Sequence, residues 1–343
     1  MVVSPLGEAR YLWRAVTRAL IYRVSGESEQ CPACASPRLY ELDLLAVRRA
    51  ERRRLGFVSG CDNCGIVFSN PLPSADDLEH FYRPGGEWRP SRKPEAVEDY
   101  RGGSWTWPFE PIRQELSVTE PPAGARVLDF GCGTGTLLDA LQVHGWETFG
   151  IEPALDDAFR KHRRLESIPD APSFDLIVAH HVLEHLPDPM GLLRQFARAS
   201  KPGGFLFLST PRFDTLPVHR DYRYVINGRA HVTAYTWDCM QVLLGRTGWV
   251  PVGLPPDRVP KGGGRTTASR LRVFARRSDQ AQPLPADPAA AARSAMREYH
   301  RGVEGRRLVE RLGWYRFAAR RAEAARQRAK RMRKSAKIGA AVS

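Results

Sequence analysis

Residues 126–138, RVLDFGCGTGTLL, hold the pattern that decides the fold of this chain. The first five, Arg126–Phe130, are apolar enough for a buried parallel strand, and 136–144 have helical spacing that ends at Gly145, a residue suited to a helix C-cap. The glycines between them allow a sharp turn and let a ligand approach the helix N-terminus, where free N–H groups favour an anionic group. The pattern predicts a strand, a glycine-rich turn and a helix that bind a nucleoside-containing cofactor.

An acidic residue follows this turn at a matching distance. The strand expected over 147–151, within ETFGIEP, leads to Glu152, which lies 21 residues after Gly131. This is close to the spacing of roughly 20 residues at which an acid after the second strand meets ribose hydroxyls in nucleotide-binding α/β sheets. The glycines read G-x-G-x-G rather than the G-x-G-x-x-G of dinucleotide sites, so NAD is the weaker choice.

Two further motifs follow in order, FDLIVAHHVLEHLPDP at 174–189 and KPGGFLFLSTP at 201–211. With them, residues 126–276 resemble the class I S-adenosylmethionine-dependent methyltransferases. The resemblance implies an α/β fold with a doubly wound, mostly parallel, Rossmann-like sheet, and an enzyme with S-adenosylmethionine as cofactor. By position, it implies cofactor-binding roles for Asp129, Gly131, Cys132, Gly133, Gly135, Glu152 and His180.

The segment AHHVLEHL borders the reacting methyl group in that family. Because the cofactor already activates the methyl group, the protein has to align the acceptor and take its proton, which suits a histidine of near-neutral pKa. His181 is the first catalytic candidate and His185 the second. The later segment RAHVTAYTW resembles the substrate-side loop, in which His231 and Tyr235 would face the acceptor, and His231 is therefore another catalytic candidate. A metal-dependent variant would use Glu184 and His185 but lacks a third ligand in the sequence.

One departure from the family concerns the adenine. Only 22 residues separate Glu152 from Asp175, where the family has a third strand with an acid for that ring. Glu166 and Asp170 are the candidate replacements. The shortening motivates one alternative function, a degenerate cofactor-fold module that binds without catalysing.

Four cysteines form a second pattern, with Cys31 and Cys34 in one C-x-x-C pair and Cys61 and Cys64 in another, 26 residues apart. This spacing is typical of a zinc ribbon, in which four thiolates complete a tetrahedron, and Gly65 suits the turn of a knuckle. Disulfides and free structural thiols are the alternatives. The N-terminal residues show no signal-peptide pattern, which favours cytoplasmic, structural zinc, and the other two cysteines are expected to pack in the core.

The second pair continues as CDNCGIVFSNPLPSADDLEHFY over 61–82. This stretch looks like the N-terminal portion of a subgroup related to sugar C-methyltransferases and cell-surface polysaccharide methyltransferases. The resemblance implies an acceptor that is a sugar or a glycan precursor.

The motifs divide the 343 residues into six parts. We expect an amphipathic N-terminal helix at 1–28, a zinc ribbon at 29–75, a connecting segment at 76–110, the methyltransferase domain at 111–279, a Pro-rich linker at 280–288 and a basic helical tail at 289–343.

Positive charge is concentrated in the tail. The chain has a formal net charge of +14, and the stretch from Arg293 to Ser343 contains 16 Lys and Arg against 4 Glu. Basic amphipathic helices bind anionic lipid surfaces and nucleic-acid phosphates alike, and they also dock on protein. We expect a cytoplasmic protein, with peripheral association at the inner face of the membrane as one partner hypothesis and nucleic acid as the weaker one.

The function that best fits these patterns is methyl transfer from S-adenosylmethionine to an oxygen or carbon of a small molecule. An RNA methyltransferase that binds phosphate through the zinc ribbon and the basic tail is the first alternative, and the non-catalytic module is the second. The G-x-x-x-x-G-K-[ST] motif is absent, so the sequence does not support ATP chemistry.

Overall fold

A computed structural model describes residues 28–49, 52–83, 85–87, 121–153, 162–218, 225–252, 270–280 and 282–299, with backbone alone at 43–49, 52–56 and 216–218. The chain divides into two compact units, Met1–Ala295 and Met296–Ser343. The helix expected at 1–28, most of the connecting segment and the tail beyond 299 lie outside the described residues. Among the described helices, none has the length and apolar character needed to cross a membrane.

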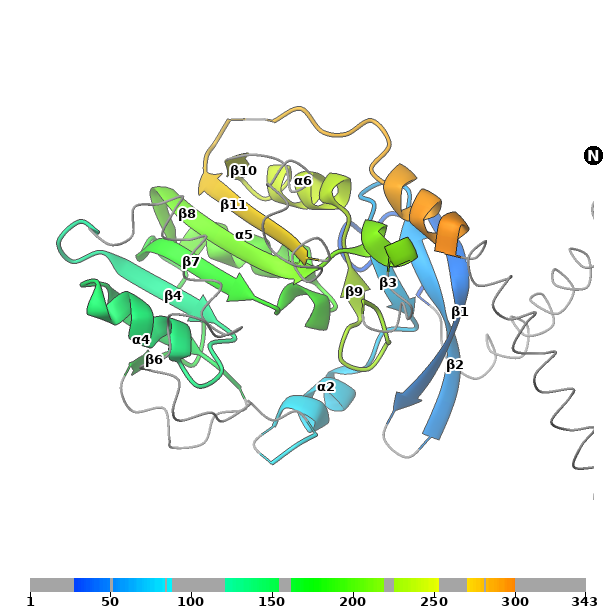
Figure 1. Cartoon of the computed structure of the whole chain (residues 1–343), viewed down its shortest axis with the longest axis horizontal. Helices are drawn as coiled ribbons and strands as arrows, with labels where there is room; N and C mark the ends of the chain where they lie inside the picture. The colour runs from blue at the N-terminus through cyan, green and yellow to red at the C-terminus, as the bar shows by residue number, and fades with distance from the viewer. Residues whose placement is uncertain are drawn as a thin grey trace, which may run out of the picture. The chain divides into compact units, whose positions relative to one another are not determined.

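A seven-stranded sheet forms the centre of the first unit, with strand order β10-β11-β8-β7-β4-β5-β6 (Figure 1). The strands are β4 (Arg126–Phe130), β5 (Glu147–Ile151), β6 (Arg163–Arg164), β7 (Phe174–His180), β8 (Ser200–Pro211), β10 (Trp249–Val252) and β11 (Arg270–Arg277). The five strands from β4 to β8 are parallel, and β11 and β10 add to the β8 edge in antiparallel orientation. The mostly parallel α/β sheet is therefore as expected. Its order reverses at β4, the point where ligands bind beyond the carboxyl ends of the strands in such sheets.

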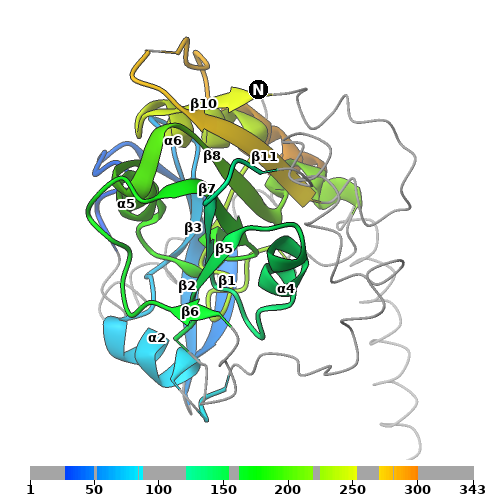
Figure 2. The same ribbon diagram turned by 90° about the vertical axis from the view of Figure 1, so that its left-hand side faces the viewer.

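Helices cover both faces of this sheet. Figure 2 shows α4 (Thr136–Val143) on one side and α5 (Pro189–Ala199) and α6 (Trp237–Gly245) on the other. Leu138 and Leu141 of α4 are buried against Val127 and Leu176 of the sheet. The α6 helix begins as expected, because the side chain of Thr236 accepts the N–H of its third residue and so satisfies a free donor of the first turn.

A second sheet is built mainly from the cysteine-containing segment. Its order is β1-β2-β3-β9, all antiparallel, with β1 (Leu39–Arg49), β2 (Arg52–Cys61), β3 (Val67–Asn70) and β9 (Thr233–Ala234). We name residues 28–70 the four-cysteine lobe. The lobe shares one hydrophobic core with the helices of the larger sheet, in which Ile66 and Phe68 are buried together with Leu183 and Met240.

Four shorter elements complete the described chain: α2 (Ala75–Tyr82), the 3-10 helices η1 (Leu183–His185) and η2 (Phe213–Val218), and a helix over 290–299. Residues 282–295 run across the four-cysteine lobe. A Cβ atom on Gly65 would lie 2.3 Å from the carbonyl oxygen of Pro288, and Arg293 pairs with Asp62 while its guanidinium lies 5.4 Å from the ring centre of Tyr40. Pro288, the last residue of the expected linker, thus packs on the lobe, and so does Arg293 after it.

Candidate active site

The glycine-rich turn joins the end of β4 to the start of α4. Gly131, Gly133 and Gly135 have positive φ angles of +77°, +53° and +81°, a region that residues with a Cβ atom disfavour. A Cβ atom on Gly131 would also lie 2.6 Å from Cγ2 of Val182. Around the same position on Gly133, no atom of the described residues lies within 4 Å. Within the described part of the chain, the turn thus leaves space for a ligand at Gly133.

Two buried carboxylates lie beside this turn, where β4 and β5 end. Glu152 is 5% exposed, and its Oε2 accepts the N–H of Gly133 at 3.1 Å. Asp129 is 4% exposed, and burial, followed by the negative charge of Glu152, raises its pKa to about 7. Carboxylate oxygens gathered in this way fit a ligand with hydroxyl donors and positive charge. The ribose diol, ammonium and sulfonium groups of S-adenosylmethionine have this chemistry.

Two other residues with expected cofactor roles lie at the same edge of the sheet. Cys132, in the turn, is 8% exposed, and burial raises the pKa of its thiol, so it stays protonated. His180 is the last residue of β7. Burial, and then the neighbouring His181, hold the pKa of His180 well below its usual range, so the ring is neutral.

The two candidate acids for the adenine lie at the surface instead. The side chain of Glu166 is 87% exposed and pairs with Arg164 at 3.6 Å. That of Asp170 is 77% exposed and pairs with Arg198. Neither is buried beside Glu152 as Asp129 is.

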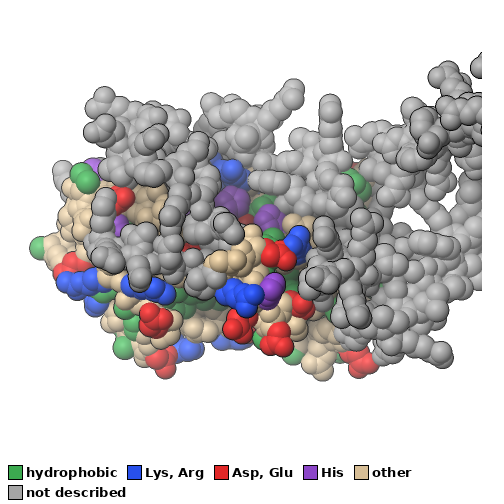
Figure 3. Space-filling model, turned by 90° about the horizontal axis from the view of Figure 1, so that it is seen from below, with side chains coloured by type: hydrophobic (Ala, Val, Ile, Leu, Met, Phe, Trp, Pro, Cys, Tyr) green, Lys and Arg blue, Asp and Glu red, His purple; other side chains and the backbone are tan. Residues whose placement is uncertain are grey.

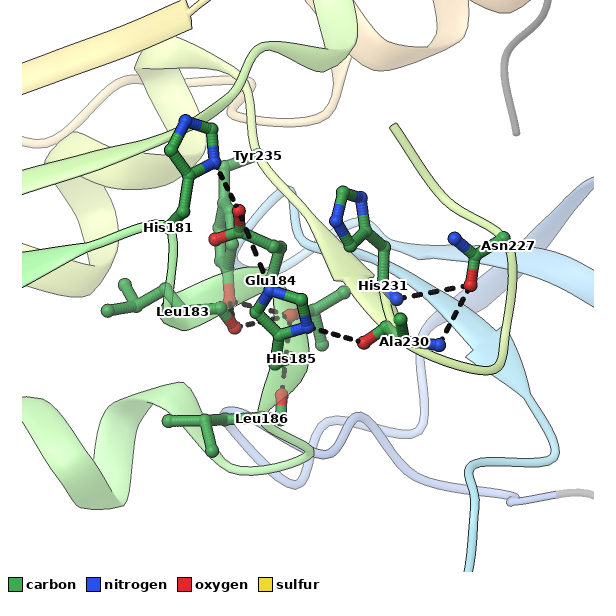
Figure 4. A network of polar contacts seen from close by, with 10 residues as sticks. His181, Leu183, Glu184, His185, Leu186, Asn227, Ala230, His231 and Tyr235 are labelled. Carbon is green, nitrogen blue, oxygen red and sulfur yellow. Dashed lines mark hydrogen bonds and ion pairs between the residues drawn. The ribbon is translucent and has the colours of Figure 1, made fainter. Parts of the chain in front are cut away.

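Beyond β7, four side chains form what we name the histidine cluster: His181, Glu184, His185 and His231 (Figure 4). His181 has a positive φ of +57°, a strained conformation for a residue other than glycine. Its backbone N–H donates to the carbonyl of Ser209 at 2.7 Å, and its Nδ1 lies 2.8 Å from Oε1 of Glu184. The opposite ring nitrogen, Nε2, is buried and has no hydrogen-bond partner among the described residues.

Glu184 is the charged centre of the cluster. It is completely buried, in the 3-10 helix η1. Burial alone would raise the pKa of this carboxyl, but the hydrogen bond with His181 and the charges of His185, His181 and His231 lower it to about 2. The carboxylate is thus ionised inside the protein, and its Oε2 has no hydrogen-bond partner among the described residues.

A loop after η2 brings the last histidine to this carboxylate. Oδ1 of Asn227 accepts the N–H groups of residues 229–231 at 3.0, 2.9 and 3.1 Å, which shapes the loop. The carbonyl of Ala230 then lies 3.0 Å from Nδ1 of His185. Because a carbonyl only accepts, Nδ1 of His185 donates to it, and Nε2, which lies 4.0 Å from Oε1 of Glu184, is the ring atom that would bind a metal. The rings of His185 and His231 lie 4.9 Å apart between centres.

Solvent reaches part of the cluster, since the side chains of His181 and His185 are 25% and 17% exposed. Figure 3 shows histidine side chains at the surface in the middle of the face seen from below, beside acidic and basic side chains.

Tyr235 does not face an acceptor, and that expectation is wrong. The residue is completely buried, and its hydroxyl donates to the carbonyl of Leu183 at 2.8 Å and contacts Oγ1 of Thr233 at 2.7 Å. The reason is strand alternation, since a residue after β9 that points inward fills the shared core. Tyr235 therefore supports η1 from beneath.

The four cysteines of the two C-x-x-C pairs come together as the spacing predicts. Sγ of Cys31 lies 3.6 Å from that of Cys64, Sγ of Cys34 lies 3.7 Å from that of Cys61, and all four sulfur atoms lie within 4.8 Å of one another. Four sulfurs at about 2.3 Å from a tetrahedral zinc ion would be separated by about 3.8 Å. The two distances of 3.6 and 3.7 Å are thus close to those of a tetrahedral site.

Sequence reasoning missed two residues of this region. Asn227 was not singled out, although the Asn-Gly pair at 227–228 is a turn signal. Thr233, whose Oγ1 donates to the carbonyl of Leu183 at 2.9 Å, has no comparable signal.

Comparison with known proteins identifies the fold that carries this site. Residues 106–252 match the model of a family described as a methyltransferase domain. A ubiquinone biosynthesis O-methyltransferase of Xanthomonas axonopodis pv. citri (strain 306) is 40% identical over 119 residues, covering 30% of this chain and 50% of that protein. Another, of Coxiella burnetii (strain Dugway 5J108-111), is 34% identical over 173 residues, covering 46% of this chain and 66% of that protein.

The chain thus spans half of the first of these relatives and 66% of the second. A solved structure of Burkholderia thailandensis 1,6-didemethyltoxoflavin-N1-methyltransferase, with bound 1,6-didemethyltoxoflavin and S-adenosylhomocysteine, has a TM-score of 0.39 and 18% identity, covering 54% of this chain and 85% of that one. The family model, the two sequence relatives and the sheet order together identify residues 106–252 as a class I S-adenosylmethionine-dependent methyltransferase domain.

Proposed function

We propose that the protein transfers a methyl group from S-adenosylmethionine to an oxygen of a small molecule. The main support is the histidine cluster at the carboxyl edge of the sheet, where an ionised, fully buried Glu184 lies 2.8 Å from Nδ1 of His181. The sequence relatives named as O-methyltransferases support oxygen as the accepting atom.

The chemistry requires few groups from the protein. When bound, S-adenosylmethionine supplies an electrophilic methyl carbon: the acceptor oxygen bonds to it, the carbon–sulfur bond breaks, and sulfur keeps the electron pair. The Nδ1–H of His181 donates a hydrogen bond to the Glu184 carboxylate, which sets the tautomer, and Nε2 is then the atom that takes the acceptor's hydroxyl proton. The Glu184 carboxylate stabilises the resulting positive charge on His181. Asp129 and Glu152 hold the cofactor.

Which small molecule is methylated is a narrower proposal. The stretch 61–82 supports a sugar or glycan precursor through its resemblance to sugar and polysaccharide methyltransferases. The names of the relatives support an acceptor from ubiquinone biosynthesis. A screen with both kinds of hydroxyl compound, measured by release of S-adenosylhomocysteine, separates them.

The four cysteines are proposed to bind a structural zinc ion. The pairwise sulfur distances of 3.6 and 3.7 Å support it. With four protein ligands, the ion has no open position for a substrate. Metal analysis of the purified protein is expected to give one zinc per chain, and substitution of Cys34 by Ser to remove it.

A metal-assisted form of the same reaction is the second candidate. The structure supplies the third ligand that the sequence lacked, because atoms of Glu184, His185 and His231 lie within 4.8 Å of one another. In that case the metal analysis gives two ions per chain, and His231→Gln loses one of them while Cys34→Ser loses the other.

We also propose a cytoplasmic protein that associates with the inner face of the membrane through its basic tail. The concentration of 16 Lys and Arg between Arg293 and Ser343 supports it. RNA as acceptor and a non-catalytic module remain the rival functions. Steep loss of RNA binding with rising salt supports the first, and failure of a folded sample to bind cofactor supports the second.

The first test is calorimetric titration with S-adenosylmethionine, S-adenosylhomocysteine and NAD. Binding of the two adenosyl compounds alone is expected. Once an acceptor is found, His181→Gln should lower kcat by roughly 10²- to 10⁴-fold, the usual contribution of a general base, because Gln cannot take a proton. His80→Gln, an exposed position on α2, serves as control. An unchanged kcat in His181→Gln would exclude the base role.

A further inference from the structure

The four-cysteine lobe is hydrogen-bonded directly to the loop that carries His231. Strand β3 begins three residues after Cys64, and it pairs with β9 in the register Val67 to Ala234 and Phe68 to Thr233. One step further along, the N–H of Ser69 donates to the carbonyl of Val232 at 2.9 Å. The segment after His231 is therefore an edge strand of the cysteine-containing sheet.

The same segment is also bonded to η1. The N–H of Val232 donates to the carbonyl of Glu184 at 2.7 Å, and Oγ1 of Thr233 donates to the carbonyl of Leu183 at 2.9 Å. The carbonyl of Ala230 accepts from His185 at 3.0 Å. Residues 230–233 thus connect the lobe on one side with the histidine cluster on the other (Figure 4).

Packing makes this connection stiff. The described side chains of the lobe belong to the common core, since Cys61 and Cys64 are completely buried in the same cluster as Leu183 and Tyr235. Close-packed interiors transmit small displacements rather than absorbing them. Movement of the second C-x-x-C pair would therefore displace β3 and, with it, the loop at 225–233.

The cofactor residues lie on the other sheet, which among the described strands has no pairing with β3 or β9, although Leu128 of β4 and Ile151 of β5 share the hydrophobic core with the lobe. The glycine-rich turn and Glu152 follow β4 and β5, and among the described strands these pair only with β6, β7 and each other. The turn is fixed to the end of β5, because the N–H of Gly131 donates to the carbonyl of Ile151 at 2.8 Å.

We propose that a metal ion held by Cys31, Cys34, Cys61 and Cys64 positions the histidine cluster, so that the lobe is the scaffold for the acceptor half of the site. The metal fixes the second cysteine pair, β3 holds residues 230–233, and these hold His185 and His231 against Glu184. The role of this scaffold in acceptor binding rests on the proposed function. The claim that the metal holds His185 and His231 in place does not depend on which reaction the cluster performs.

The test compares the zinc-replete full chain with the same protein after chelation. The ring ¹⁵N signals of the histidines are recorded in both states and assigned with His→Gln variants. Signals of His185 and His231 are expected to shift, whereas that of His162, held by Thr148 at 2.8 Å and Asp139 at 3.1 Å on the far side of β4, stays constant. Re-addition of zinc should restore the signals.

Two further measurements accompany the spectra. Amide hydrogen exchange of residues 225–235 should accelerate by at least about tenfold in the chelated protein, because their pairing partner is released. Affinity for S-adenosylhomocysteine should change by less than about twofold, since the strands that carry the cofactor residues are not paired with β3 or β9. Unchanged exchange and unchanged His185 and His231 signals after verified metal loss would overturn the proposal.

Variants separate positioning from general loss of structure. Thr233→Val removes the hydroxyl that bonds to η1 but leaves the cysteines intact, so the metal should be retained while the His185 signal shifts. Arg293→Ala, at a residue that packs against the lobe, is the matched control: it breaks the pairs with Asp62 and Asp287 and should leave both signals in place. A shift in Arg293→Ala equal to that in Thr233→Val would contradict the proposed route. If the chain binds no S-adenosylhomocysteine at all, the proposed function fails while the positioning result stands.

Discussion

At the scale of single residues, the buried acid pair defines the cofactor side of the site. Glu152 accepts a backbone N–H from Gly133 and lies close enough to Asp129 to raise the pKa of that residue. Two carboxylates taken out of water at one sheet edge cost stability unless a ligand supplies donors or positive charge. The two buried carboxylates are therefore better explained by a role in ligand binding than by a contribution to the stability of the fold.

Replacing Glu152 by Ala should weaken the binding of S-adenosylhomocysteine by about 1 to 3 kcal/mol, the scale of lost hydrogen bonds to a charged group. Calorimetry would show a rise in Kd of roughly 5- to 150-fold. Glu166→Ala, at an 87% exposed side chain, is the control. Equal affinities in wild type and Glu152→Ala would mean that another residue binds the ribose.

Asp129 should make the protein lose stability as pH rises. Its pKa is raised from 3.8 to about 7 on folding, so between these values the folded state holds a proton that the unfolded state has released. The contribution of Asp129 to stability is present below pH 4 and is lost as pH rises through 7, at about 1.4 kcal/mol per unit of pKa difference. Asp129→Asn should therefore melt at a higher temperature than wild type above pH 7 and at a similar one near pH 4. A difference in melting temperature between Asp129→Asn and wild type that stays constant across this pH range would refute the raised pKa of Asp129.

At the scale of elements, the turn between β4 and α4 requires glycine at residue 131 for two reasons: the left-handed backbone conformation there and the close side chain of Val182. Gly131→Ala combines a positive φ of +77° with a Cβ atom 2.6 Å from Val182. Gly124→Ala has nearly the same φ, +74°, but no described atom within 4 Å. Both should lose about 1 to 2 kcal/mol from the left-handed conformation. Gly131→Ala should lose a further 1 to 3 kcal/mol, roughly, from overpacking.

Denaturant unfolding of the two variants measures this difference. The Gly131 variant should also bind S-adenosylhomocysteine more weakly, because relief of the clash moves the turn or the Val182 loop, whereas the Gly124 variant should bind normally. Equal unfolding free energies would show that Val182 moves aside without cost.

At the scale of the whole molecule, the C-terminal part divides between Ala295 and Met296. Ala289, Ala292 and Ala295 are buried, and Arg293 pairs with Asp62 of the lobe. Residues 300–343 contain 14 Lys and Arg against 3 Glu. The first part belongs to the packed unit Met1–Ala295, and the second carries most of the positive charge.

Truncation at two points tests this division. Deleting 300–343 should leave the melting temperature and cofactor affinity unchanged and reduce binding to vesicles that contain anionic lipid, because the charge is removed. Deleting 282–343 should also lower the melting temperature by several degrees, since a change of about 1 kcal/mol shifts it by roughly 2 to 4 °C in a domain of this size. Unchanged vesicle binding in the shorter deletion would remove the membrane hypothesis.

Much of the site could be predicted because its signals are local. Contiguous residues form both the turn at Gly131, Gly133 and Gly135 and the strand that leads to Glu152. Each of these glycines has a positive φ, a conformation that favours glycine over other residues. The pairing of the two C-x-x-C motifs is a spacing rule of the same kind. Tyr235 was misplaced because a single residue after a two-residue strand carries no reliable inside–outside signal.

The sequence by itself therefore determined the fold class, the cofactor turn and the four-thiol cluster, since each depends on residues that are close together in the chain or on residue types with one strong preference. Only the tertiary structure decided that His231 meets Glu184 and His185, that Asn227 shapes the loop between them, and that β3 of the four-cysteine lobe pairs with β9. These contacts join segments that lie far apart in the chain, and their pairing is selected by the packing of one shared core, which no local pattern encodes.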